Sequence, residues 1–174
     1  MCGADYNKLG LMQDKDKTKE QLISELTALR QRISELEKAE QEYRQLAYHL
    51  RERARELSCI YAIAQIIDAP DTTLYEIYQQ VVELLPSGWQ YPEIARARIV
   101  IGDKEFKTMG YREKKWKLSS DIEVHGSKRG TVEVCYLEPK PEMNMGPFLS
   151  EEWLLLSIVA GRLGRVTELR QTKH

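Results

Sequence analysis

Two side chains in the second half of the chain, Cys135 and His125, could take part in metal or redox chemistry. A thiol and an imidazole can both ligate haem or a metal ion, and an accessible thiolate reacts with oxidants. Two ligands leave most of a coordination sphere unfilled, however, and the cysteines of this chain form no CxxC pair. A buried thiol and a solvated imidazole are the alternative interpretation, and we predict no metal site and no cofactor.

Four aromatic side chains could form a lid over a small ligand: Trp89, Tyr91, Tyr111 and Trp116. The last two belong to the segment KTMGYREKKWKL, residues 107–118, in which five of twelve residues are Lys or Arg. Such a segment cannot readily wall a cavity of about 300 Å³ or more with apolar side chains, so we expect a small pocket or none. The predicted ligand-binding residues are these aromatics with His125 and Cys135, and packing of the aromatics in the core is the alternative.

His49, in the segment AYHLRERAREL, could accept a phosphoryl group in the manner of a kinase phosphoacceptor helix. The heptad count given below places it at an exposed c position, which an ordinary surface residue also occupies. A kinase needs an ATP-binding domain with glycine-rich loops as well, and nothing after Leu169 could supply one. No Ser/His/Asp, Cys/His or paired-carboxylate spacing indicates hydrolysis. We therefore predict no catalytic residue and no enzyme activity for this chain.

The charge balance makes nucleic acid and anionic membranes poor candidate partners. Lys and Arg total 26 and Asp and Glu 27 among 174 residues, so no net field attracts a polyanion. No apolar stretch approaches the ~20 residues that a membrane-spanning helix needs, and residues 1–16 lack the basic-then-apolar order of a secretory signal. We expect a cytoplasmic protein with one globular domain and an extension.

A long helix is expected to carry His49, because apolar residues on both sides of it recur with alternating spacings of four and three. This heptad seam exceeds the length of about three or four heptads that usually identifies a coiled coil. A single long helix packed on its own domain is the alternative. The seam residues assigned to a dimer interface are Leu22, Leu26, Leu29, Ile33, Leu36, Tyr43, Ala47, Leu50 and Leu57.

Charges beside the seam favour a parallel homodimer. In a parallel, in-register pair, Glu25 lies opposite Arg30 and Arg32 lies opposite Glu37, whereas an antiparallel pair loses this match. Exposed pairs of this kind contribute only about 0–1 kcal/mol each. Glu40 interrupts the seam at an a position, and the heptad spacing changes at residue 57, where we expect the coil to enter a globular domain.

Beyond the coil, the pattern predicts first a helix and then a sheet. Ala69-Pro70 ends the coil helix, Asp71 or Thr72 caps the next helix, and Glu76 is placed for a capping box. That second helix has one apolar face and stops at residues 86–88.

Two β-hairpins and a last helix complete the predicted domain. The first hairpin turns at Gly102-Asp103 and places Ile99 opposite Phe106, and the second turns across residues 126–130. The last helix begins near Ser150 as N-cap. This order predicts an α+β domain with the helices on one face of an antiparallel sheet. The other face would present mostly polar side chains, namely Glu123, His125, Glu133, Cys135 and Leu137.

Several segments of the chain resemble GAF-like domains of PAS- and GAF-containing sensor histidine kinases of bacteria and archaea. They are PSGWQYPEIARARIVIGDKEFKT, KKWKLSSDIEVHGSKRGTVEVCYLEPKPEMNMGPFLSEEW and RLGR, between residues 86 and 165. The segment KTKEQLISELTALRQRISELEKAEQEYR resembles the coil-forming linkers of the same kinases. The resemblance implies a GAF-like antiparallel sheet, with N- and C-terminal helices packed on one face, after a long coiled-coil helix. The implied divisions are a disordered tail at 1–15, a coiled-coil signalling helix at 16–58 and a GAF-like domain at 59–174.

The same resemblance implies where a ligand would bind and what the chain would do. In larger GAF domains the pocket lies on the sheet face away from the terminal helices, and here the cover over that face would come mainly from residues 107–118. The chain would be a sensory or regulatory module of two-component signalling, either a histidine kinase fragment or a stand-alone GAF protein. It would act as a homodimer and relay conformational change to a transmitter domain, a kinase domain or another signalling protein.

Paired terminal helices would extend the dimer interface beyond the coil, which adds Val159, Leu163 and Val166 of the last helix. Two other functions stay open. One is a structural dimerisation adaptor without a ligand. The other is a redox or haem sensor that acts through Cys135.

Overall fold

The computed structural model describes residues 17–172. The chain divides into two compact units, with the division between His49 and Leu50. The second unit begins before residue 59, the predicted start of the domain, because Arg55 and Glu56 already pack on it. The predicted disordered tail at 1–15 lies outside the described residues.

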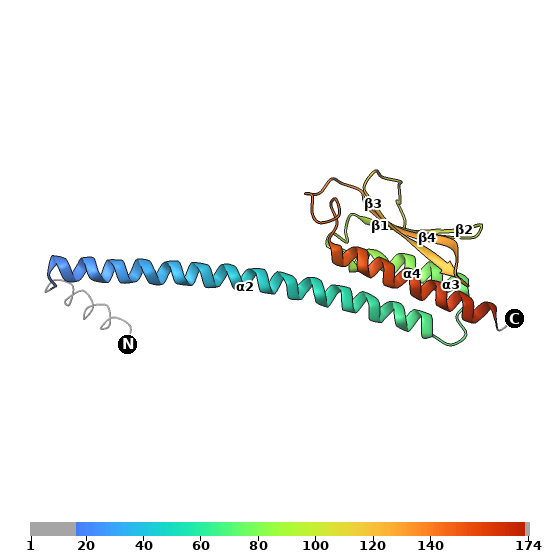
Figure 1. Ribbon diagram of the computed structural model, residues 1–174, viewed down its shortest axis with the longest axis horizontal. Helices are drawn as coiled ribbons and strands as arrows, with labels where there is room; N and C mark the ends of the chain where they lie inside the picture. The colour runs from blue at the N-terminus through green and yellow to red at the C-terminus, as the bar shows by residue number, and fades with distance from the viewer. Residues whose placement is uncertain (1–16, 173–174) are drawn as a thin grey trace, which may run out of the picture. The chain divides into compact units, whose positions relative to one another are not determined.

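One long helix, α2, runs from Lys19 to Asp68 (Figure 1). It begins with a reciprocal cap, because the Gln21 N–H donates to Thr18 Oγ1 at 3.3 Å and the Thr18 N–H donates to Gln21 Oε1 at 2.9 Å. It ends just before Pro70, whose ring disfavours helical backbone at the preceding residue. The predicted helix through the heptad seam and its predicted end are both confirmed.

A shorter helix, α3, spans Leu74–Leu84 and leads into a 3₁₀ turn, η1, at Leu85–Gly88. Its N-cap is Thr73, whereas Asp71 or Thr72 was predicted. The Glu76 N–H donates to Thr73 Oγ1 at 3.2 Å and the Thr73 N–H donates to Glu76 Oε2 at 2.7 Å, so the predicted capping box is present.

Four antiparallel strands form one sheet in the order β2-β1-β4-β3. Ile99 pairs with Phe106 across the first hairpin, as predicted, and Gly102 supplies the positive φ of 58° that its turn needs. The strands are β1 at Ala95–Ile101, β2 at Lys104–Lys107, β3 at Lys117–Val124 and β4 at Ser127–Tyr136.

The second hairpin turn differs from the prediction. It lies at His125 and Gly126, with φ values of 51° and 71°, and not across residues 126–130. Two successive residues with positive φ match the twist of a two-residue hairpin turn, so β4 begins at Ser127 and gains the residues that were assigned to the turn. The prediction relied on the glycines at 126 and 130 as turn residues, whereas His125 supplies one of the two positive φ values, a conformation that is less common for non-glycine residues.

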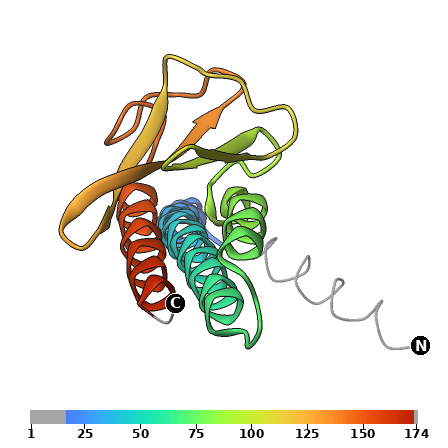
Figure 2. The ribbon, with the colours of Figure 1, turned by 90° about the vertical axis from the view of Figure 1, so that its right-hand side faces the viewer.

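The last helix, α4, spans Ser150–Gln171, and Leu149 rather than Ser150 is its N-cap residue. Figure 2 shows α3, α4 and the last part of α2 together on one side of the sheet. The hydrophobic core lies in this layer, where Ile99, Val134 and Ile122 of the sheet are fully buried. The predicted α+β class, with helices on one face of an antiparallel sheet, is confirmed.

Three residues of α4 were predicted to line a dimer interface, and this prediction is wrong. Val159, Leu163 and Val166 are buried in the core of their own chain. The stripe that they form faces the sheet, which Gly164 also approaches closely: a Cβ at this position would lie 2.1 Å from the Glu123 carbonyl oxygen. Side chains buried in this way cannot contact a second copy.

Candidate functional site

Glu133 lies on the outer face of the sheet, the face turned away from the helices. Its cross-strand neighbours are Arg98 on β1 and Ser119 on β3. Lys117 Nζ donates to Glu133 Oε1 at 3.0 Å, the Tyr111 hydroxyl donates to Glu133 Oε2 at 3.1 Å, and Arg98 Nη1 lies 3.7 Å from Oε2. We call these four residues, Arg98, Tyr111, Lys117 and Glu133, the Glu133 cluster. Two cations and a phenol thus compensate one buried carboxylate.

Residues 108–116, here called the strap, connect β2 to β3 and cover this face. The Thr108 N–H donates to the Ala97 carbonyl at 3.0 Å, and the Ala97 N–H donates to Thr108 Oγ1 at 3.0 Å, so the strap begins as an extension of the strand pairing. Further along, Cys135 Sγ donates to the Arg112 carbonyl at 3.4 Å. The 107–118 segment thus covers part of the outer face, around Glu133 and Cys135, whereas Ser119, Asp121 and Glu123 of β3 are exposed.

Burial favours the neutral forms of two groups under the strap, Cys135 and Tyr111. It raises the pKa of the Cys135 thiol, and it raises the pKa of the Tyr111 hydroxyl to about 12. The hydrogen bond to Glu133 raises the pKa of Lys117, which therefore stays charged. A protonated thiol that is fully buried is neither a nucleophile nor a ready metal ligand.

The structure does not gather the predicted ligand-binding residues into one site. Tyr111 and Cys135 share the outer face, but Trp89 is fully buried in the core and cannot serve as a lid. Tyr91 packs edge-on against Tyr136, with 5.5 Å between ring centroids. Trp116 is half exposed and lines a cavity of about 330 Å³ beside the segment after β4.

His125 lies at the opposite end of the β3–β4 pairing from Cys135. Cys135 pairs with Lys117, whereas His125 follows Val124, the last residue of β3. The backbone N–H of His125 donates to the Glu168 carboxylate of α4. The two residues therefore cannot share a metal ion or a haem. Within residues 17–172, no group of three or more His, Cys, Asp and Glu side chains is placed to hold a metal ion.

Sequence reasoning missed a buried carboxylate, Glu152, in the first turn of α4. Its Oε1 accepts from the Gln90 N–H at 2.7 Å and from the Tyr136 hydroxyl at 2.9 Å, and its Oε2 accepts from the Leu149 N–H at 2.8 Å. Burial raises its pKa above the ordinary value. The sequence predicts a helix that begins near Ser150, but nothing in the spacing distinguishes a buried carboxylate in its first turn from a solvated one.

The heptad seam forms an exposed apolar ridge on α2. The exposed fraction of its large residues ranges from 39% for Leu22 to 72% for Tyr43. Glu40, which interrupts the seam, pairs with Arg44 on the next turn of the same helix, with Nη2 and Oε1 2.6 Å apart. Further along the same helix, Cys59 and Ile63 are buried in the core of the second unit. One helix thus carries both a ridge that is exposed among residues 17–172 and part of the domain core.

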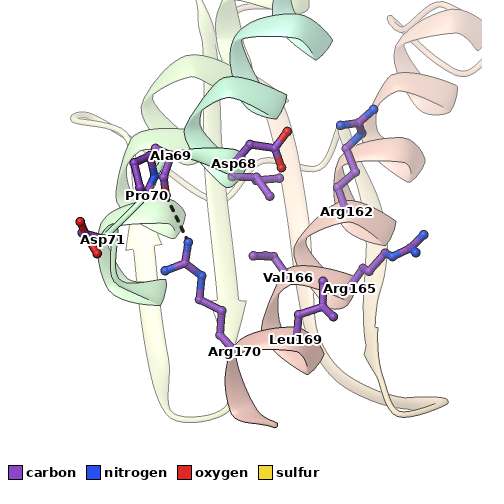
Figure 3. A pocket seen from close by; sticks show the side chains of 10 residues that line it. Asp68, Ala69, Pro70, Asp71, Arg162, Arg165, Val166, Leu169 and Arg170 are labelled. Atoms are coloured by element: carbon purple, nitrogen blue, oxygen red, sulfur yellow. Dashed lines mark hydrogen bonds between the residues drawn. The ribbon is translucent and has the colours of Figure 1, made fainter. Parts of the chain in front are cut away.

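A groove of about 880 Å³ lies between the end of α2 and the last turns of α4 (Figure 3). Arg170 reaches the loop between α2 and α3, where its guanidinium donates to the carbonyls of Thr72 and Ala69. Arg162 and Arg165 extend away from this loop and are exposed. Leu169, which lines this groove, and Leu154 are large apolar residues exposed on α4.

Comparison of the sequence with protein-family models and with curated proteins finds no match. No helix within residues 17–172 is both long and apolar enough to cross a membrane.

Proposed function

We propose that the chain is a cytoplasmic sensory or regulatory module of two-component signalling that works as a parallel homodimer. One observation carries the proposal: α2 bears the exposed heptad ridge and also contributes Cys59 and Ile63 to the domain core. Apolar ridges of this length are typical of helices that bury them against a second helix. The resemblance to GAF-like domains and to the linkers of sensor histidine kinases supports a signalling role, with a transmitter or kinase domain as partner.

The outward face of α4 replaces the buried residues as the part of the last helix that a second copy would contact. Leu154 is exposed near its start and Leu169 near its end. Leu57 and Tyr61 are exposed on the part of α2 that belongs to the same unit. In the proposed dimer these side chains continue the interface that begins at the coil.

Light scattering tests the dimer directly. The wild-type chain should have twice the mass of the 20.3 kDa chain. Leu29→Glu places a carboxylate at a d position and should yield a monomer, because two like charges would be buried in one interface. Ala28→Glu introduces the same charge at a c position, outside the seam, and should leave the dimer intact. A wild-type monomer, or equal behaviour of the two variants, would refute the proposal.

Disulfide crosslinking tests the orientation. In a background with the three native cysteines replaced (Cys2→Ser, Cys59→Ala and Cys135→Ala), the variant Leu36→Cys should crosslink efficiently to itself. Identical d positions face one another only in a parallel, in-register pair. Absence of the crosslink in a protein that is dimeric by light scattering would establish another orientation. A relay further requires that the pattern along the seam changes when the input state changes.

One observation favours a second function, the structural dimerisation adaptor without a ligand. On the outer face, the Glu133 carboxylate is engaged by Tyr111 and Lys117 of the same chain, and the Cys135 thiol is engaged by the strap. A dimer whose crosslinking pattern stays constant under every input would support the adaptor.

A further inference from the structure

A second cavity, of about 490 Å³, lies at the end of the sheet that carries both hairpin turns. It is formed by the first turns of α3, by the two hairpins and by the last turns of α4. It lies on the helix side of the sheet, because its sheet residues Phe106 and Val124 belong to the core cluster. It is therefore separate from the strap and the Glu133 cluster, and its volume lies in the range of about 300–1,000 Å³ of small-molecule sites.

Aromatic rings form one wall of this cavity. Phe106 packs against Tyr75 with 5.1 Å between ring centroids and against Tyr78 with 5.3 Å. Tyr75 is more than half exposed, whereas Phe106 and Tyr78 are buried. An exposed ring next to buried rings offers a flat surface on which a planar apolar group can stack.

A pair of buried hydroxyls supplies a polar group in the same wall. Thr167 Oγ1 donates to the Leu163 carbonyl at 2.6 Å, so its proton is engaged. The Tyr78 hydroxyl therefore donates its proton to Thr167 Oγ1. The lone pairs of the Tyr78 oxygen stay free to accept one further hydrogen bond.

Two cationic side chains that line the cavity are exposed, namely Lys104 at the start of β2 and Arg129 on β4. Among residues 17–172, neither side chain has a carboxylate within ion-pair distance, although Asp103 also lines the cavity. The neighbouring Lys128 differs, because its Nζ lies 2.7 Å from Asp121 Oδ1. Cations without a partner beside an aromatic wall are the groups that recognise an organic anion.

We propose that this cavity binds a small organic anion with a flat aromatic body, of the aromatic carboxylate class. The ring stacks on the exposed Tyr75, and the carboxylate pairs with Lys104 and Arg129. Because Thr167 and Gln171 of α4 line the cavity, the bound anion links α3 and both hairpins to the end of this helix. A role for this anion as the signal that the module senses rests on the proposed function, whereas binding of the anion to the cavity does not.

Binding is tested with cinnamate and its neutral analogue cinnamamide, followed by amide chemical shifts of the full-length chain. Cinnamate should bind saturably and shift the amides of Gly102, Phe106 and Gln171. Cinnamamide should bind roughly tenfold more weakly, because it lacks the charge-assisted hydrogen bonds. Lys104→Gln and Arg129→Gln should each weaken cinnamate to a similar degree and leave cinnamamide unchanged. Lys128→Gln makes the same charge change next to Arg129 but outside the cavity, and should have no effect.

Three results would overturn the proposal: no saturable binding of either compound at millimolar concentration, equal affinity for both, or shifts confined to residues outside the cavity. The same titration on Leu29→Glu separates this proposal from the dimer. If the proposed dimer is correct, this variant is a monomer that binds cinnamate through an intact cavity. Binding by a wild-type chain that is itself monomeric would uphold the site and refute the dimeric relay.

Discussion

Glu133 lies directly opposite Arg98 in the β1–β4 pairing, and its carboxylate is also the acceptor for Tyr111 of the strap. A cross-strand pair on the outer face of the sheet thereby holds the loop that covers it. The strap has few apolar anchors: Met109 is almost fully exposed, and Trp116 is half exposed. Its position therefore depends on polar contacts, from Thr108 to β1 and from Tyr111 and Arg112 to β4.

Replacing this carboxylate should loosen the strap. We expect Glu133→Gln to lower the free energy of unfolding in urea by about 1–3 kcal/mol, because an amide cannot serve both Lys117 and Tyr111 as acceptor in a buried position. Trypsin should also cleave after Arg112 faster. Glu105→Gln is the matched control, since Glu105 pairs with Arg98 at 2.8 Å on the exposed edge strand and should matter little. Equal effects of the two substitutions would show that the strap does not depend on Glu133.

Two glycines of α4 should respond to alanine in opposite directions. At Gly164 a Cβ would lie 2.1 Å from the Glu123 carbonyl oxygen, so Gly164→Ala should destabilise the domain by about 1–3 kcal/mol as α4 and β3 separate. At Gly161 a Cβ would have nothing within 4 Å. Gly161→Ala should therefore stabilise the exposed helix interior by up to about 1 kcal/mol. Thermal unfolding of both variants checks the prediction, and stabilisation by Gly164→Ala would contradict the close helix–strand contact.

Glu152 should make stability depend on pH. Burial raises its pKa above 4.5, so the folded chain binds this proton more tightly than the unfolded chain. The resulting contribution to stability is fully present below pH 4.5 and is lost as the pH rises through the raised pKa. Urea unfolding of wild type, compared with Glu152→Gln, should show a free-energy difference that falls with rising pH in this window. A difference that grows with pH would mean that the hydrogen bonds lower the pKa instead.

The two cysteines in the described part of the chain should be unreactive. Burial raises the pKa of Cys59 to about 11 and also raises that of Cys135. In a Cys2→Ser background at neutral pH, we expect iodoacetamide to modify both thiols only as fast as the domain opens, since thiolate and access are both lacking. Mass spectrometry of the modified peptides gives the rates. Rapid modification of Cys135 would restore the redox-sensor hypothesis.

Local patterns in the sequence predicted the fold more completely than the site. The register of Ile99 with Phe106 follows from a short turn and an alternating pattern, both contained in a dozen adjacent residues. The end of α2 follows from Pro70 alone. Each of these elements is specified by residues that are neighbours along the chain and does not depend on tertiary contacts.

The site depends on contacts between distant residues, which local patterns do not contain. The Tyr111–Glu133 hydrogen bond joins the strap to a strand beyond β3, and the Glu152 carboxylate joins the segments before β1, at the end of β4 and before α4. Periodicity identifies an apolar stripe on α4, but it does not say which surface the stripe faces. Val159 and Leu163 were therefore assigned to a dimer interface, although they pack in the core of the chain.

The three donors on Glu152 also decide how α4 is able to move. Its first turn is hydrogen-bonded through Glu152 to the backbone N–H groups of Gln90 and Leu149 and to the Tyr136 hydroxyl. Moving this end of the helix would break all three hydrogen bonds and leave buried polar groups unsatisfied. The far end carries the buried Tyr78–Thr167 hydrogen bond and the Arg170 contacts to the loop after α2. A displacement of α4 that keeps the Glu152 hydrogen bonds is consequently a rotation about the start of the helix, and such a rotation moves Gln171 the most.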